Sequence, residues 1–379
     1  MALSVQKQII TMRCSGCILR KVGLATIHFS MKFEDLPSYQ QILADLTKKR
    51  RKIHLLFGNG FSMAYDRNIF SYNALSTFIE KVDDDLLKKL FHTLDTKNFE
   101  VIMQQLDTFA EIAKIFSTDS TLVLRINQAS EKLKRSLIDA VKELHPEHVF
   151  TIPEAACTNC YAFLDRYLSN EGLIFSTNYD LLPYWVLMRN KSPHANDGFG
   201  KDLENATGEY IPEDELQYSE ELRWGKRKQD QTIYYLHGTL PFFDNGIDIV
   251  KEVYSTENFL LQNISNRMEK KEYPIFVTAG NGKQKLTHIM HNKYLSHYFD
   301  KFSSIEGSLV TFGFNFSEQD SHIIDGINKA AHFGKREGDK LQSIYIGVFS
   351  QQGLEYIESI RGKFKCKVNL YNSQTTNIW

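Results

Sequence analysis

A glycine-rich segment follows the first strongly apolar run of the chain. Residues 55–65, LLFGNGFSMAY, join a buried-strand pattern to the start of a helix pattern. Their candidate ligand-binding residues are Gly58, Asn59, Gly60, Phe61 and Ser62. Paired glycines let the backbone pass close to a bound group, and the first N–H groups of a helix favour a phosphate. The full dinucleotide fingerprint would need a third glycine where Met63 stands. A tight strand-to-helix turn without a ligand also accounts for this segment taken alone.

Three later apolar runs also end in short polar residues. These runs lead into FSTNYDLLPYW, YYLHGTL and TFGFNFSEQDSHI. The polar residues are Thr177, Asn178 and Asp180, then His237 with Gly238, then Gly313, Asn315, Ser317 and Asp320. In an open α/β sheet, ligands bind outside the carboxyl ends of the strands. One such histidine would more often be structural, but four strand ends of this kind together predict a single ligand cleft.

The elements that must position these residues alternate along the chain. Strands are expected over Ile53–Gly58, Gly172–Thr177, Thr232–Gly238, Pro274–Gly280, Ser308–Phe314 and Ser343–Phe349, with an edge strand over Cys366–Tyr371. Helices are expected over Leu36–Arg51, Ala155–Leu168, Lys293–Phe302 and Ser321–Phe333. Short, fully apolar strands alternating with helices predict an α/β fold with a mainly parallel sheet.

The chain of 379 residues is interpreted as one nucleotide-binding domain over residues 31–379. A helical insertion or subdomain is expected at about residues 73–150, where apolar residues recur with helical period. A polar, irregular insertion or lid is expected at about residues 189–231, which contain several glycines and prolines. No second catalytic unit is expected in the remaining length.

Composition excludes several classes of protein. Lys and Arg number 45 against 46 Asp and Glu, a net charge of -1, with 42% hydrophobic and 24% charged residues. This balance is typical of a soluble globular protein, and we expect a cytoplasmic one without a membrane span or direct nucleic-acid binding. The basic run Lys48–Lys52 is explained as a solvated helix end. The run Arg223–Lys228, with Trp224 among its charges, is a candidate for a regulatory or partner contact.

The amino terminus and the cysteines carry weaker signals. Residues 1–30 contain no Asp or Glu, which is typical of an organellar transit peptide, although Met31 as the working start is an alternative. Two CxxC pairs occur, at Cys14–Cys17 and Cys157–Cys160. The second pair lies in a helix pattern instead of the turn that a zinc knuckle needs, so no metal site is expected.

The motifs GNGFS, TNYD, LHG and GFNFSEQDSHI, in this order, resemble the sirtuin-like NAD-binding proteins. The resemblance covers about residue 52 to the end of the chain. A bacterial branch of that family is most similar, through FSY (Phe70–Tyr72), NFExxM (Asn98–Met103) and the stretch Pro274–Leu295. The resemblance implies a Rossmann-like parallel sheet that binds NAD.

The same resemblance implies a role for each matching segment. The Gly58–Ser62 loop would wrap the NAD pyrophosphate, and Ser176–Asp180 would lie beside the nicotinamide ribose. His237 would act as a base towards a ribose hydroxyl or water, and Gly313–Ser317 would contact the adenosine side. Asn178 could orient the attacking water or hold the nicotinamide amide. For Asp180, support of developing positive charge, a ribose contact and a structural cap all remain open.

Two departures separate the chain from sirtuin deacetylases. Those enzymes carry a four-cysteine zinc module after the HG motif, whereas this chain has no cysteine between His237 and Cys366. Their GIPDFR segment is replaced by MAYDRNIFSY. Zinc-free members of the family act mainly as NAD hydrolases in prokaryotic antiviral defence. The hypothesis is therefore an NAD hydrolase that consumes NAD as its substrate.

Two other readings stay open: a non-catalytic module that senses NAD or ADP-ribose, and a residual protein deacylase. A toxic NAD hydrolase needs restraint, so a homo-oligomer, a regulatory protein partner or both are expected. The helices of residues 73–148 are the candidate assembly surface or lid.

Overall fold

The computed structural model describes residues 32–69, 85–94, 99–116, 120–201, 210–212, 222–255, 257–277, 281–332 and 340–379. The extension predicted at residues 1–30, with its CxxC pair, lies outside the described residues. The FSY motif at Phe70–Tyr72 does so too.

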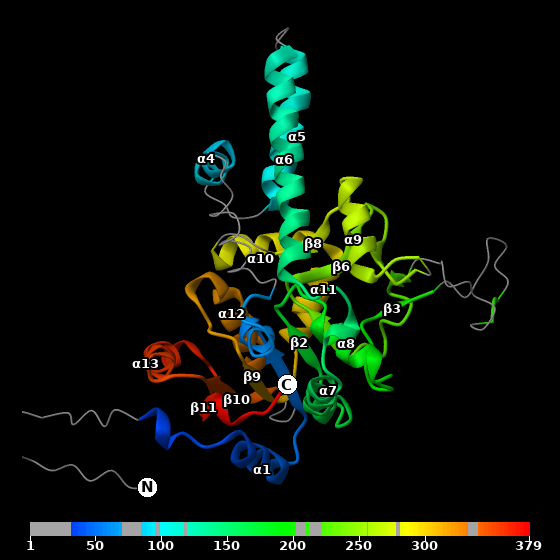
Figure 1. The fold of residues 1–379 in the computed structure, drawn as a ribbon. Helices are drawn as coiled ribbons and strands as arrows, with labels where there is room; N and C mark the ends of the chain where they lie inside the picture. The colour runs from blue at the N-terminus through cyan, green and yellow to red at the C-terminus, as the bar shows by residue number, and fades with distance from the viewer. Residues whose placement is uncertain are drawn as a thin grey trace, which may run out of the picture.

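The central element is a six-stranded sheet in which all neighbouring strands are parallel (Figure 1). In spatial order its strands are β11 (Lys367–Asn372), β10 (Leu341–Val348), β9 (Gly307–Phe312), β1 (Ile53–Phe57), β2 (Ile174–Ser176) and β5 (Ile233–Tyr235). Counted by their order along the chain from the β5 edge, these strands run 3-2-1-4-5-6, the Rossmann order. The predicted α/β fold with a parallel sheet is confirmed, and β11 is the predicted edge strand.

Helices pack on the sheet because its strands are apolar on both faces. α7 (Glu154–Leu168) contacts β1 and β2, α11 (Lys293–Phe302) contacts β5, and α12 (Ser321–His332) contacts β10. The remaining helices around this sheet are α1 (Tyr39–Lys49), α2 (Asn59–Met63), α8 (Leu182–Arg189), α10 (Gly282–His291) and α13 (Gln351–Ile360). The prediction that Cys157 and Cys160 lie on a helix is confirmed, and both thiols are free and buried in α7.

The first helix is shorter than predicted because local signals fix both of its ends. Ser38 forms a capping box with Gln41 at the start of α1. Arg50 adopts the left-handed conformation with φ 51° and ends the helix. The chain then enters β1 three residues later.

A second, antiparallel sheet lies beside the parallel one. Its strands in spatial order are β3 (Phe199–Gly200), β4 (Leu222–Trp224), β7 (Ile249–Lys251), β6 (Gly238–Asp244) and β8 (Pro274–Phe276). The strand predicted at Pro274–Gly280 exists as β8, but its assignment to the parallel series was wrong, because a short apolar run does not reveal its partner's direction. Likewise, residues 189–231 are not wholly irregular, since β3 and β4 come from them. α9 (Leu260–Glu269) packs against β6.

The predicted helical stretch contains α4 (Asp85–Thr93), α5 (Phe99–Phe116) and α6 (Ser120–Leu144). Figure 1 shows α5 and α6 side by side, extending away from the sheets. The second half of α6 is buried through Leu133, Leu137 and Val141, which recur at helical spacing. Near the far end of the pair, large apolar side chains are exposed: Phe109, Ile112, Ile115, Phe116, Leu122 and Leu124.

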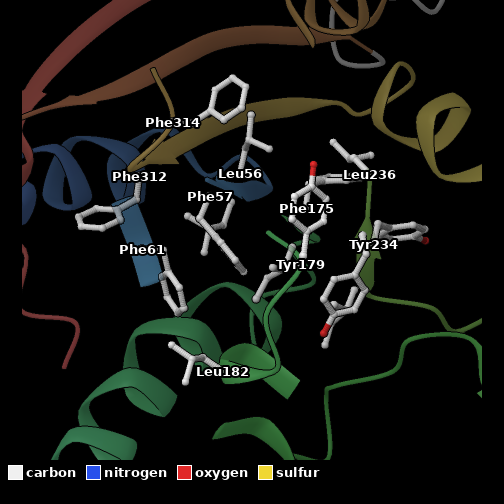
Figure 2. Packing of buried hydrophobic residues seen from close by; sticks show 14 of the residues in the cluster. Leu56, Phe57, Phe61, Phe175, Tyr179, Leu182, Tyr234, Leu236, Phe312 and Phe314 are labelled. Carbon is white, nitrogen blue, oxygen red and sulfur yellow. The ribbon is translucent and has the colours of Figure 1, made fainter. Parts of the chain in front are cut away.

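Aromatic side chains fill the core next to the ends of the central strands (Figure 2). The ring centroids of Phe57 and Phe61 lie 4.3 Å apart, and those of Phe175 and Tyr234 lie 5.2 Å apart. These rings anchor the backbone from which the polar strand-end segments emerge. In the described parts of the chain, every helix is too short or too polar to cross a membrane.

Candidate functional site

Four strands of the parallel sheet end at one aligned row of residues. Phe57 pairs with Ser176 on one side and Phe312 on the other, and Ser176 pairs with Tyr235. GNGFS, TNYD, LHG and GFNFS each begin at the residue that follows one member of this row. Since neighbouring strands are about 4.8 Å apart, the four segments lie at the same edge of the sheet. The winding of the sheet reverses between β1 and β9, inside this row, where open α/β sheets bind their ligands.

Backbone contacts between glycines join the first and last of these segments. The Gly60 N–H donates to the Gly313 carbonyl oxygen at 2.9 Å. A Cβ atom on Gly60 would lie 2.6 Å from the Gly313 Cα, and one on Gly58 would lie 2.7 Å from the Phe314 ring. Packing between loops therefore requires these glycines, and the Gly60 N–H is already used. A phosphate at this edge would have to be held by other N–H groups of the loop.

Ser62 connects the first two segments through a buried hydrogen-bond network. Its Oγ donates to Asp180 Oδ2 at 2.5 Å and accepts from Asn178 Nδ2 at 2.7 Å. All three side chains are buried. A hydroxyl has one proton, and an ionised carboxylate only accepts, so Asn178 must present its NH₂ group to Ser62. The network thus sets the orientation of the Asn178 amide, and its Oδ1 has no hydrogen bond among the described residues.

Asp180 is held as a structural carboxylate. Its Oδ1 accepts the N–H of Leu182, the first residue of α8, while Oδ2 accepts from Ser62. Burial raises the pKa of Asp180 from 3.8 to about 6, although the hydrogen bonds from Ser62 and Leu182 work against this rise. Of the three roles left open for Asp180 from the sequence, this geometry favours the cap.

His237 faces a second histidine. Its Nε2 lies 2.9 Å from Nε2 of His322, which comes from α12, and both side chains are buried. Burial lowers the pKa of His322 to about 4 and that of His237 well below its usual range. Both rings are therefore neutral near pH 7, and one Nε2 carries the proton while the other accepts it. A neutral His237 can act as a base.

Asp320 lies next to this histidine pair. Ligand atoms of Asp320, His237 and His322 all lie within 4.8 Å of one another, a set that could in principle hold a metal ion. However, the Asp320 carboxylate already accepts from Lys285 Nζ at 2.7 Å and from Ser317 Oγ at 2.8 Å. The Lys285 ammonium would oppose a divalent cation at this carboxylate. The chemistry of the cluster fits a hydrogen-bond network better than a metal centre.

The other predicted residues lie at the same edge with different exposures. Asn59 and Thr177 are half-buried, and Asn315 is exposed. The Phe61 side chain points into the core, where it packs on Phe57 and Trp379. Phe61 can therefore face a ligand at this edge only through its backbone.

Sequence reasoning did not identify His322 and Lys285 as site residues. His322 lies in the quoted GFNFSEQDSHI segment, on the apolar face of a helix pattern, where a lone histidine looks like core. Lys285 belongs to α10, which follows a strand of the other sheet. A third missed histidine, His145, accepts the Leu181 N–H at 2.9 Å and so supports the loop after Asp180.

A protein-family model described as Domain of unknown function (DUF4917) matches residues 55–379. The match begins within β1 and includes all four strand-end segments. A search of curated proteins found no match to the chain.

Proposed function

The chain belongs to the family described as Domain of unknown function (DUF4917), and we propose that it is an NAD glycohydrolase. The proposed reaction is NAD⁺ and water giving nicotinamide, ADP-ribose and a proton. The observation that carries the proposal is the aligned row of strand ends at the reversal point of a Rossmann-ordered sheet. A dinucleotide is the ligand that suits this position in such a sheet.

Asn178 and His237 would perform the chemistry. Ser176 and Tyr235 pair with each other on adjacent parallel strands, and Asn178 and His237 each lie two residues after one of them. Loss of neutral nicotinamide leaves positive charge on the ribose, and water then forms the new bond to the same carbon. The Asn178 Oδ1, oriented by Ser62, would hold that water or the nicotinamide amide. The neutral His237 would accept the proton that the water or a ribose hydroxyl gives up.

Burial of these residues agrees with an enzyme that rests in a restrained state. Asn178 is 6% exposed and His237 is 3% exposed, so NAD can reach them only if the surrounding segments move apart. An NAD-depleting effector in antiviral defence would need such restraint and a trigger. We include in the proposal a homo-oligomer or a regulatory protein partner, with the exposed apolar end of α5 and α6 as its contact surface.

The test is incubation of the purified chain with NAD, alone and with the products of neighbouring genes, and detection of nicotinamide and ADP-ribose. The variants His237→Ala and Asn178→Ala should lower turnover at least about 100-fold. His332→Ala is the matched control, because that histidine is exposed at the end of α12. Unchanged turnover in both site variants would remove the residue assignment. Stoichiometric NAD binding without product under every condition would instead indicate a sensing module.

A further inference from the structure

A separate cavity lies between α8 and the second sheet. Its volume is about 460 Å³, and its walls come from α8, β5 and the strands β3, β4 and β7. None of the predicted strand-end residues lines it. This volume falls within the range of small-molecule sites, roughly 300–1,000 Å³.

A buried ammonium group lines the cavity. Lys251 is 6% exposed, and its Nζ donates to Asp197 Oδ2 at 2.6 Å. An ammonium group has three N–H donors, and no other hydrogen bond of Lys251 Nζ is found among the described residues. Because unused donors on a buried cation are costly, the remaining two favour an acceptor that enters from the cavity.

Aromatic and hydroxyl groups form the walls around this ammonium. Tyr184, Phe199 and Tyr235 line the cavity, and Lys251 Nζ lies 5.0 Å from the Tyr184 ring centroid and 5.4 Å from that of Phe199. Ser192 also lines it, and its buried Oγ has no hydrogen-bond partner in the described structure. Flat apolar walls of this kind accept a planar ring, and the serine hydroxyl can serve a polar substituent.

Positive charge predominates around the cavity. Among the described residues that line it, Lys191, Lys201, Arg227 and Lys251 stand against the carboxylate of Asp197, so four positive charges less one negative charge leave +3. Arg227 belongs to the basic run Arg223–Lys228 that the sequence marked as a candidate contact. The chain as a whole is almost neutral, with a net charge of -1. The local excess therefore favours an anionic ligand.

We propose that this cavity binds a phosphorylated nucleoside of the size of a nucleoside monophosphate. The base would lie against the aromatic walls, and the phosphate would accept from Lys251 and Arg227. The ligand would touch α8 through Tyr184, and the first N–H of α8 is the one that Asp180 accepts. The cavity is thus one helix away from the Ser62 network. The inference does not rest on the proposed hydrolase activity.

The test is isothermal titration of the full chain with AMP, adenosine, ribose 5-phosphate and inorganic phosphate. We expect AMP to bind at least about tenfold more tightly than any of the other three, since only AMP offers both the ring and the anion. AMP lacks the bond that an NAD glycohydrolase cleaves, so the result is independent of turnover. No AMP binding up to about 1 mM would overturn the proposal, as would equal affinity for adenosine or inorganic phosphate.

Variants locate the binding. Arg227→Met changes an exposed side chain and should weaken AMP at least about threefold without affecting folding. The double variant Lys251→Met with Asp197→Asn removes both buried charges together and should weaken AMP at least about tenfold. Lys365→Met is the matched control at an exposed lysine outside the cavity. AMP affinity that is unchanged in Arg227→Met and in the double variant would place the ligand elsewhere and contradict the proposal.

Discussion

The effect of the substitution Asp180→Asn on the free energy of unfolding should change sign as the pH rises. The pKa of Asp180 is raised from 3.8 to about 6, mainly by burial. Between these two values the unfolded chain has lost the proton that the native state keeps, so the carboxyl makes stability fall as pH rises. The contribution is fully present below pH 3.8 and is lost once the pH passes about 6. At about 1.36 kcal/mol per pKa unit, the loss is about 3 kcal/mol.

Asparagine at this position carries no charge at any of these pH values. Its amide can still accept the Leu182 N–H, but its NH₂ group meets a Ser62 hydroxyl that needs an acceptor. This mismatch costs about 1 kcal/mol, independent of pH. We therefore expect the variant to be about 1 kcal/mol less stable than the parent at about pH 3, and about 2 kcal/mol more stable at about pH 7.5.

Urea denaturation followed by circular dichroism at a series of pH values measures this difference. Asp325→Asn is the matched control, because Asp325 is exposed on the same type of element, a helix. The control should show a nearly constant difference from the parent across the series. The same constant difference in Asp180→Asn would refute the reasoning, since it would mean that burial does not hold the proton on this carboxyl in the native state.

Two further substitutions test the packing of the strand ends. Gly60→Ala brings a Cβ within 2.6 Å of Gly313 Cα and should lower the free energy of unfolding by about 2–3 kcal/mol. Gly362→Ala is the control, because its Cβ would meet no atom within 4 Å, and it should change the free energy of unfolding by less than about 1 kcal/mol. Equal effects in the two melting curves would contradict the loop packing. Ser62→Ala leaves a buried carboxylate and a buried amide short of one partner each and should cost about 2–4 kcal/mol at neutral pH. Ser136→Ala, at a helix surface, should cost less than about 0.5 kcal/mol in the same assay, and a similar small loss at Ser62 would argue against the network.

The parallel sheet was predictable because each of its strands has a signal in its own local sequence. Two examples are the short apolar runs Ile53–Phe57 and Gly307–Phe312, which lie next to turn residues. Short apolar runs that alternate with helix patterns are typical of buried strands in a parallel sheet. The antiparallel sheet was not predictable in the same way. β6 begins at Gly238, directly after His237, and contains Pro241, so it has no separate strand signal. Which strand it pairs with, and in which direction, depends on contacts between distant segments, and the local sequence does not indicate these contacts.

Part of the candidate site could also be found in the sequence. Ser62, Asn178, Asp180 and His237 stand out because small polar residues and a histidine follow apolar runs directly. Their grouping at one edge follows from parallel strands. The partner His322 could not be found, because its contact with His237 joins residues 85 positions apart and needs α12 to pack against the strand end. Helix patterns state which face is buried, not which residue it meets.

The sequence by itself determined the alternation of strands and helices, the polar ends of four strands and the near-neutral charge. These properties depend only on residue type and on spacing along the chain, so they can be predicted from short segments of sequence. Only the tertiary structure decided the strand order, the aligned row at Phe57, the Ser62 network and the charged cavity around Lys251. Those features need several distant segments at defined distances, and burial acts on the pKa values of Asp180 and His237 only after the chain has packed around them.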